Sequence, residues 1–182
     1  MYRYKVGYSF EDEFKNSAIF PSHDSNLELN FYLSRLCLDS KYRKYKNCEA
    51  SKKEIIFNEH RVDWSSEVVI VEGIFDALKA GENSIPILGS WIDQNYALFK
   101  KIIKEKCDVV LALDLDAQDK QIKIAKNLMS YGINVKVSEP CERDLGDMTK
   151  KEAEKFIINA KPFDNIERMR YLISGIKSGS IF

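Results

Sequence analysis

The sequence is poor in the residues that build zinc sites, disulfide frameworks and membrane spans. Its four cysteines include no Cys-x-x-Cys pair, and only two histidines could supplement them, so we expect reduced thiols and no zinc. The amino-terminal residues lack the apolar stretch of a signal peptide, and no segment approaches the ~20 apolar residues of a membrane span. We therefore expect a cytoplasmic protein with no membrane partner.

The chain also lacks an excess of charge of either sign. It has 28 Lys and Arg residues against 28 Asp and Glu residues, so its formal net charge is zero. No overall field then draws the protein to nucleic acid, and any such binding depends on local clusters of charge. A phosphate-binding loop of the form G-x-x-x-x-G-K-[ST] is absent, which excludes a motor domain of that type. The 182 residues, 45% of them hydrophobic, suffice for one medium or two small globular domains.

Acidic residues follow two apolar runs that have the composition of buried strands. Residues 68–71 precede Glu72, and residues 109–113 precede Asp114 and Asp116. Because ligands of open α/β sheets bind at the carboxyl ends of the strands, these carboxylates are candidates for one site. Asp114 and Asp116 share a face of an extended segment, and a divalent cation would relieve the repulsion between them. Oxygen ligands of this kind suit Mg²⁺.

The part of the chain that carries these acids alternates between apolar runs of strand length and amphipathic segments of helix length. This alternation predicts an α/β fold with a parallel sheet and helices on both faces. The expected elements are strand 67–71, helix 74–80, strand 85–88, helix 93–105, strand 108–113, helix 118–130 and strand 133–137.

A third acidic element follows the last expected strand. Asp144 and Asp147 stand in a turn, after which Thr149 and Glu152 have the spacing of a capping box that opens a helix to about residue 159. Such a turn explains both aspartates without any chemistry, although either one of them could instead be functional.

Residues 1–63 have the pattern of a small antiparallel unit with local positive charge. Short strand-like pieces alternate with polar segments, and we expect a turn at residues 21–26. Between Arg35 and Lys53 basic residues outnumber acidic ones by seven to two, and Tyr45 is one of two tyrosines among them. Such a tract can follow a phosphate backbone and stack bases, although a solvated cationic loop has the same composition.

The order of these motifs resembles the Toprim domain, which bacterial-type (DnaG-like) primases, topoisomerases and several nucleases share. The resemblance rests on a strand followed by Glu72-Gly-x-x-Asp76 and a later strand followed by Asp114-Leu-Asp116, and it covers about residues 66–148. The preceding residues resemble the amino-terminal subdomain of the primase core, in the form of compact phage primases, back to about residue 5. The similar elements there are Phe20-Pro21-Ser22, Leu29-Asn30-Phe31-Tyr32, Arg35, Lys44-Tyr45 and Ile55-Ile56-Phe57-Asn58-Glu59.

The resemblance implies a fold and a domain organisation. The fold is α/β, with a Toprim-like, mostly parallel sheet flanked by helices, preceded by a small α+β basic subdomain. The domains implied are an amino-terminal primase subdomain at residues 1–63, a Toprim domain at 64–160 and a carboxy-terminal helical tail at 161–182.

The resemblance also implies a divalent-metal site. Glu72, Asp114 and Asp116 are the expected catalytic residues, and together with Asp147 they are the expected ligands of Mg²⁺ or Mn²⁺. Other residues are expected to support these ligands rather than to react, namely Asp76, Gly73 and Asp144.

Contacts to nucleic acid or nucleotide are implied for Arg35, Lys44 and Tyr45, because bacterial primases have a comparable Lys-Tyr pair. The chain departs from the bacterial pattern after Asp-x-Asp, where a glycine and an arginine are replaced by a sequence that ends in Lys120. A nucleotide contact at that position would have to be made differently. Ser90, after the second expected strand, has a hydroxyl that could approach phosphate or simply form a turn.

The hypothesis that follows is a DNA primase catalytic core, which joins ribonucleoside triphosphates into short RNA primers on single-stranded DNA. A replicative helicase and a separate zinc-ribbon module are the expected partners, because the chain lacks both parts, and the host cytoplasm is the expected location if the protein is viral. One alternative is a Toprim nuclease, against which the basic subdomain argues. Another is a non-catalytic nucleic-acid-binding or helicase-associated subunit, against which the intact acids argue.

Overall fold

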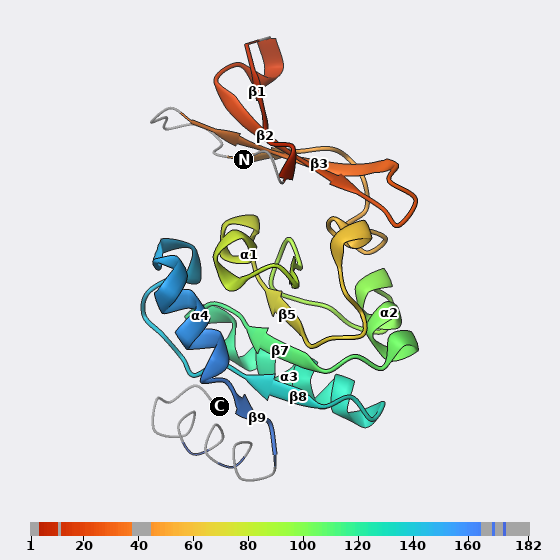
Figure 1. Ribbon diagram of the computed structural model, residues 1–182, viewed down its shortest axis with the longest axis vertical. Coiled ribbons are helices and arrows are strands. Elements are labelled where there is room, and N and C mark those ends of the chain that lie inside the picture. The colour runs from red at the N-terminus through yellow and green to blue at the C-terminus, as the bar shows by residue number, and fades with distance from the viewer. Residues whose placement is uncertain (1–3, 11, 38–44, 165–168, 170–172, 174–182) are drawn as a thin grey trace. The chain divides into compact units, whose positions relative to one another are not determined.

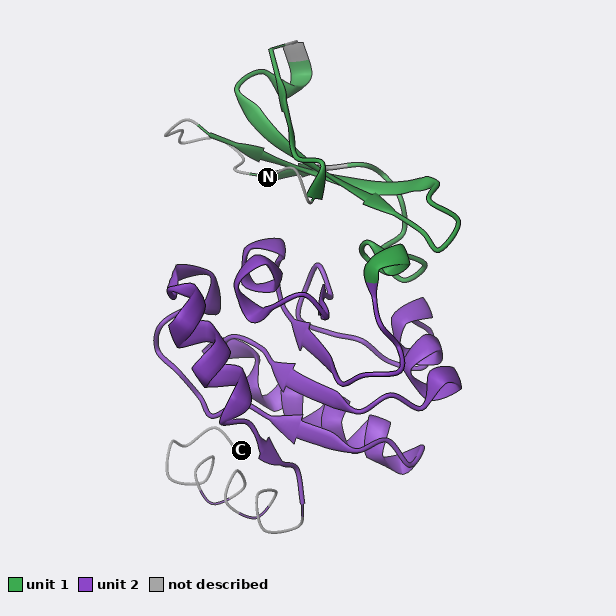
Figure 2. Cartoon of the chain, in the orientation of Figure 1, with its two compact units in different colours: residues 1–61 green, residues 62–182 purple. Residues whose placement is uncertain are grey.

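The computed structural model of the chain describes residues 4–10, 12–37, 45–164, 169 and 173 (Figure 1). The chain divides into two compact units, residues 1–61 (unit 1) and residues 62–182 (unit 2), which are coloured separately in Figure 2. The division lies close to residue 63, where the sequence places the end of the first domain.

Unit 1 is built on a four-stranded antiparallel sheet with the order β1-β2-β3-β4. The predicted antiparallel unit is thereby confirmed. Its strands are β1 (Gly7–Ser9), β2 (Ser17–His23), β3 (Leu29–Leu36) and β4 (Tyr45–Asn47), and 3₁₀ turns occupy Asp12–Phe14 and Glu59–Arg61.

The turn predicted at residues 21–26 is wrong at its start, because β2 continues through Pro21. Proline is tolerated there since β1 pairs only with residues 17–19 of β2, so among the described residues no strand pairs with β2 on that side at Pro21. The chain reverses afterwards at Asp24, whose side-chain oxygen accepts a hydrogen bond from the backbone N–H of Glu28 at 2.9 Å. An aspartate that binds backbone in this way starts turns more effectively than composition alone suggests.

Unit 2 is an α/β unit whose five-stranded sheet has the order β6-β5-β7-β8-β9. The first four of these strands are parallel, and β9 is antiparallel to β8. The predicted fold class, a mostly parallel sheet with helices, is confirmed. The strands are β5 (Val68–Val71), β6 (Ser84–Pro86), β7 (Val109–Ala112), β8 (Val135–Val137) and β9 (Lys161–Pro162), and the helices are α1 (Ile74–Ala80), α2 (Ala97–Glu105), α3 (Gln118–Ser130) and α4 (Lys150–Ile158).

Several expected elements of unit 2 differ in extent from the structure, among them strands 85–88 and 133–137, which are observed as Ser84–Pro86 and Val135–Val137. The helix expected from residue 93 begins at Ala97, because Asp93 first forms a turn in which its side chain accepts a hydrogen bond from the N–H of Asn95 at 2.9 Å. The strand β9 lies at the start of the range assigned to the carboxy-terminal tail. Beyond residue 164 that tail falls outside the described residues, apart from positions 169 and 173.

The centre of the sheet in unit 2 is apolar on both faces. Every residue of β5 and of β7 is buried, as expected for parallel strands covered by helices on both sides. One face packs against α1, α4 and the segment before α4, through side chains that include Val71, Ala112, Ala77, Leu145 and Ala153. None of the helices within the described ranges has both the length and the hydropathy needed to cross a bilayer.

The connections of β5 create a topological switch point between β5 and β7. From β5 the chain passes through α1 to β6 on one side, and it then passes through α2 to β7 on the other side of β5. Strand order therefore reverses between β5 and β7, and such switch points are where open α/β sheets bind ligands, at the carboxyl ends of the strands. Both acidic motifs of the sequence follow these two strands.

Candidate metal centre

Three acidic side chains converge at the switch point. Glu72 follows β5 directly, and Asp114 and Asp116 follow β7, whose Ala112 is paired with Val71. Glu72, Asp114 and Asp116 each offer a carboxylate oxygen, and these oxygens lie within 4.8 Å of one another. Two ligands on opposite sides of one Mg²⁺ would be about 4.2 Å apart at the usual ~2.1 Å bond length. A single small cation can therefore contact all three after slight side-chain movement.

The surroundings of the Glu72 carboxylate disfavour its negative charge. Its Oε2 atom is shielded from solvent and has no hydrogen-bond partner among the described residues. Burial, reinforced by the charges of Asp114 and Asp116, raises the pKa of Glu72 to about 7, and the charge of Lys120 opposes the shift. This oxygen is buried, has no hydrogen-bond donor and lies beside two other carboxylates. A bound cation would supply the missing partner and reduce the repulsion between the negative charges.

The surroundings of Asp114 also disfavour the charged form of its carboxylate. Burial raises its pKa to about 6, and the charges of Asp76, Asp144 and Asp116 act in the same direction. Asp114 and Asp144 also line one small pocket beside the end of β7, together with Arg143 and Leu145. The third acidic element of the sequence thus lies close enough to the cluster to affect its electrostatics.

Two glutamines at the start of α3 hold the backbone that leads to Asp114. Gln121 is fully buried, and its Oε1 accepts a hydrogen bond from the backbone N–H of Leu113 at 2.9 Å. Its Nε2 donates to Gln118 Oε1 at 3.3 Å, and Gln118 Nε2 in turn lies 3.4 Å from the carbonyl oxygens of Leu113 and Asp114. Sequence reasoning missed Gln121, although a polar residue three positions before the buried Ile124 was an available signal.

Asp76 connects the turn after Glu72 to the turn that carries Asp144 and Asp147. Its Oδ2 accepts a hydrogen bond from the backbone N–H of Gly73, and its Oδ1 accepts one from the N–H of Gly146, both at 2.8 Å. Burial raises the pKa of Asp76, and these two hydrogen bonds oppose the rise. The supporting role expected for Asp76 and Gly73 therefore has a geometric basis, because one side chain fixes the turn after Glu72 and the turn beside Asp144.

The backbone at both glycines approaches Asp76 too closely for a larger residue. A Cβ atom added at Gly73 would lie 3.0 Å from Asp76 Oδ2. One added at Gly146 would lie 3.0 Å from Asp76 Oδ1 and 3.3 Å from the Cβ of Phe75. Neither glycine has a positive φ, so the requirement is for space and not for an unusual backbone conformation.

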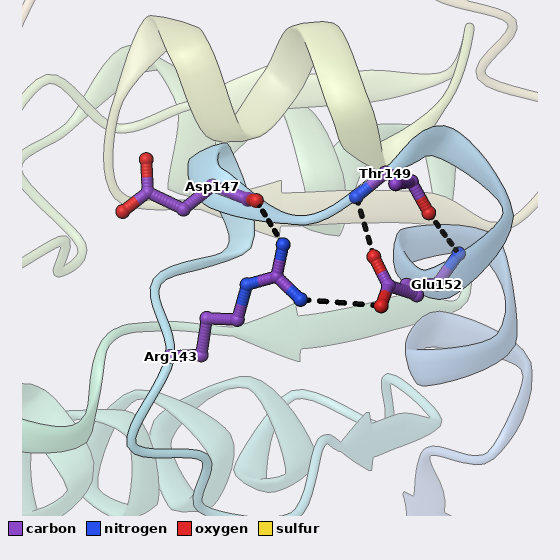
Figure 3. Close-up of polar contacts among 4 residues, drawn as sticks. All are labelled: Arg143, Asp147, Thr149 and Glu152. Carbon is purple, nitrogen blue, oxygen red and sulfur yellow. Dashed lines mark hydrogen bonds and ion pairs between the residues drawn. The ribbon is translucent and has the colours of Figure 1, made fainter.

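The turn that carries Asp144 and Asp147 is tied to the start of α4 (Figure 3). Arg143 donates one hydrogen bond to the carbonyl oxygen of Asp147 and another to Glu152 Oε1 at 3.1 Å. The predicted capping box is confirmed: Thr149 N–H donates to Glu152 Oε2 at 2.7 Å, and Glu152 N–H donates to Thr149 Oγ1 at 3.3 Å.

Asp147 does not belong to the group of three clustered acids. Its side chain is exposed, and in Figure 3 its carboxylate points away from Arg143. The only group of three or more potential ligands among the described residues is Glu72, Asp114 and Asp116. The role of Asp147 as a metal ligand remains a prediction, as does the supporting role of Asp144.

Two of the three residues expected to contact nucleic acid lie together in unit 1. Arg35 of β3 is paired with Tyr45 of β4, and its guanidinium carbon lies 4.3 Å from the centre of the tyrosine ring. Lys44 lies outside the described residues. The nucleic-acid role of these residues remains a prediction.

No model of a known protein family matches the chain. A DNA primase of Staphylococcus aureus (strain COL) is 22% identical over 145 residues, which cover 73% of this chain and 24% of that protein. The chain resembles the zinc-binding and RNA polymerase domains of the Aquifex aeolicus primase with a TM-score of 0.68 and 20% identity, over 84% of this chain and 42% of that one. It resembles a DnaG primase catalytic domain bound to single-stranded DNA with a TM-score of 0.65 and 16% identity, over 86% and 56% of the two chains. The chain thus has the fold of a DnaG primase catalytic core, and it spans about a quarter of the curated relative.

The close approach at Asp76 predicts that Gly146→Ala destabilises unit 2. The added Cβ would displace the Asp76 carboxylate or the backbone of α1, which we expect to cost about 1–3 kcal/mol of unfolding free energy. Denaturant unfolding followed by tryptophan fluorescence is a suitable measurement, because both tryptophans, Trp64 and Trp91, belong to unit 2.

Gly89→Ala is the matched control for that substitution. No atom lies within 4 Å of a Cβ added at Gly89, and its φ is not positive, so we expect a change below about 0.5 kcal/mol. Equal effects of the two substitutions would show that Asp76 does not impose the constraint.

The raised pKa values of Glu72 and Asp114 predict that cation affinity increases with pH. A cation binds the deprotonated carboxylates, so the affinity for Mn²⁺ should rise between about pH 5.5 and about pH 8 and binding should release protons. Titration calorimetry in buffers of different ionisation enthalpy measures both quantities. An affinity that is constant over this range would contradict the assignment.

The same shifts predict an opposite trend for stability without a cation. Raised carboxyl pKa values favour the protonated folded state, and this contribution is lost as the pH rises through about 6 and about 7. Glu72→Gln removes one of these two shifts, so its stability relative to the unsubstituted protein should increase over this range, as measured by denaturant unfolding in chelator. A constant difference would contradict the electrostatic account.

Proposed function

We propose that this chain is the catalytic core of a DNA primase, which joins ribonucleoside triphosphates into short RNA primers on a single-stranded DNA template. The observation that carries the proposal is the convergence of Glu72, Asp114 and Asp116 at the switch point of a fold shared with DnaG catalytic cores. Similarity to the DNA primase of Staphylococcus aureus supports it, and so does similarity to the solved DnaG catalytic domain that is bound to single-stranded DNA.

In this proposal the three clustered carboxylates bind Mg²⁺ or Mn²⁺, with Asp147 as a further ligand. Bound there, such a cation would neutralise triphosphate charge and assist the in-line displacement of pyrophosphate. The residues of the chain supply the geometry: Gln121 positions the backbone before Asp114, and Asp76 positions the turn after Glu72. Their hydrogen bonds keep the carboxylates together despite their mutual repulsion.

Unit 1 would bind the template or the nucleotide in this proposal. The guanidinium of Arg35 can donate to a phosphate while its flat face rests on Tyr45, which leaves the ring edge for further contacts. Lys44 would add a second positive charge next to this pair in the sequence. The pair is consistent with binding to a flexible single strand, where stacking and charge act together.

Sequence recognition and strand opening would come from other proteins or domains. The Aquifex aeolicus structure contains a zinc-binding domain beside its RNA polymerase domains, and this chain spans 42% of it. We propose a separate zinc-ribbon module and a replicative helicase as partners, and the cytoplasm, of a host cell if the protein is viral, as the place of action.

The decisive assay uses single-stranded DNA, labelled ribonucleotides and Mg²⁺ or Mn²⁺. We expect short RNA products that Asp114→Ala abolishes, because the cation site loses a ligand. Asp119→Ala is the matched control, since it removes an exposed carboxylate from the first turn of α3 and should leave synthesis unchanged. Strand cleavage without synthesis would indicate a Toprim nuclease instead, and DNA binding with neither activity would indicate a non-catalytic subunit.

Substitution of Arg35 tests the proposed role of unit 1. Arg35→Ala should lower the affinity for single-stranded DNA about fivefold to tenfold and reduce the slope of log affinity against log salt by about 0.7, the value for one phosphate contact. Lys15→Ala removes the same charge from an exposed position of unit 1 and should change neither quantity. Equal losses for both variants would mean that only overall charge matters.

A further inference from the structure

Lys120 forms a side-chain contact with Ser90, and neither residue belongs to the group of clustered acids. It is the third residue of α3, and its Nζ donates a hydrogen bond to Ser90 Oγ at 2.6 Å. Ser90 lies in the segment that follows β6, the neighbour of β5 in the sheet. The contact therefore links two segments that leave the carboxyl-end edge of the sheet, where the metal centre also lies.

The contact between Lys120 and Ser90 lies beside the metal centre in the chain and in the sheet. Lys120 stands four residues after Asp116, and Ser90 follows β6, which pairs with β5, the strand that leads to Glu72. Other lysines of unit 2 pair with carboxylates, as Lys101 does with Glu105 and Lys136 with Glu67. Within the part of the chain that the structure describes, no ion pair includes Lys120, and its hydrogen-bond partner is a neutral hydroxyl. A lysine that served only to stabilise the fold would gain more from a carboxylate partner.

The pair has the donors of an anion site. An ammonium group has three N–H donors, of which the contact to Ser90 uses one. The serine hydroxyl accepts that hydrogen bond and retains its own proton as a donor. The two side chains can therefore donate together to the oxygen atoms of one phosphate group.

We propose that Lys120 and Ser90 form a phosphate subsite that binds the triphosphate of the incoming nucleotide beside the metal centre. This inference rests on the proposed function, since a triphosphate must lie against the cation bound by Glu72, Asp114 and Asp116. The triphosphate is favoured over a template phosphodiester because it carries several negative charges at one place, and Lys120 follows the Asp114-Leu-Asp116 motif of the metal centre by only four residues.

The test compares ATP with AMP as probes, using equilibrium binding to the full chain in Mg²⁺. Lys120→Ala should weaken ATP binding about tenfold, the loss of one charge-assisted hydrogen bond, and should change AMP binding by less than about twofold. Lys120→Arg should retain most of the ATP affinity. Lys123→Ala, which removes an exposed charge one turn further along α3, is the matched control and should bind ATP as the unsubstituted chain does. Ser90→Ala should show a smaller loss than Lys120→Ala, because it removes a neutral donor.

A second readout separates this role from a structural one. Lys120→Ala should bind Mn²⁺ alone at least as tightly as the unsubstituted chain, because removal of a positive charge beside Glu72 cannot repel a cation. If Lys120 only held the segments together, Mn²⁺ binding would weaken along with ATP binding, and the proposal would be wrong. Unchanged ATP affinity, or a loss confined to single-stranded DNA binding, would also overturn it.

The two proposals can fail separately in these experiments. If the chain makes no primer but Lys120→Ala still weakens ATP binding selectively, the proposed function is wrong and the phosphate subsite remains. If the chain makes primers and Lys120→Ala binds ATP as tightly as the unsubstituted chain, only the subsite is wrong.

Discussion

The pairing of β5 with β7 is the constraint on which the site depends. Both strands are buried along their whole length, so their register is set by the core, with Val71 opposite Ala112. The residues that follow the two strands then emerge side by side at one edge of the sheet. Those residues are acidic, so the fold both buries carboxylates and brings them together. Burial, reinforced by the neighbouring negative charges, raises the pKa values of Glu72 and Asp114.

Hydrogen bonds from neighbouring side chains hold the backbone segments that carry the three acids. Gln121 fixes the segment before Asp114 from inside the core, and Asp76 accepts two backbone amides that belong to distant parts of the sequence. Neither side chain neutralises the clustered charge, since one is an amide and the other is itself an acid. Lys120 supplies a positive charge nearby, but it is bonded to a hydroxyl instead of a carboxylate. The site is therefore built to keep its negative charge available to a ligand.

Much of this site was predictable from the sequence, because apolar strands followed by acids specify their own geometry. The strands β5 and β7, the helices α1 and α3 and the cluster of three acids follow from periodicity together with the Toprim resemblance. Contacts between segments distant in the sequence were not predictable, such as the hydrogen bond between Asp76 and the amide of Gly146. The course of β2 through Pro21 depends on how far β1 extends beside it, which no local pattern encodes.

The central claim is that Glu72, Asp114 and Asp116 bind a divalent cation at the switch point of the sheet. Anomalous diffraction from crystals of the chain equilibrated with Mn²⁺ at about pH 7.5, where both shifted carboxylates are mostly ionised, tests it most directly. The account predicts an anomalous peak between the three carboxylates, with a manganese-oxygen distance to each that is typical of coordination. Manganese bound elsewhere on the chain, with no peak between these carboxylates, would contradict it.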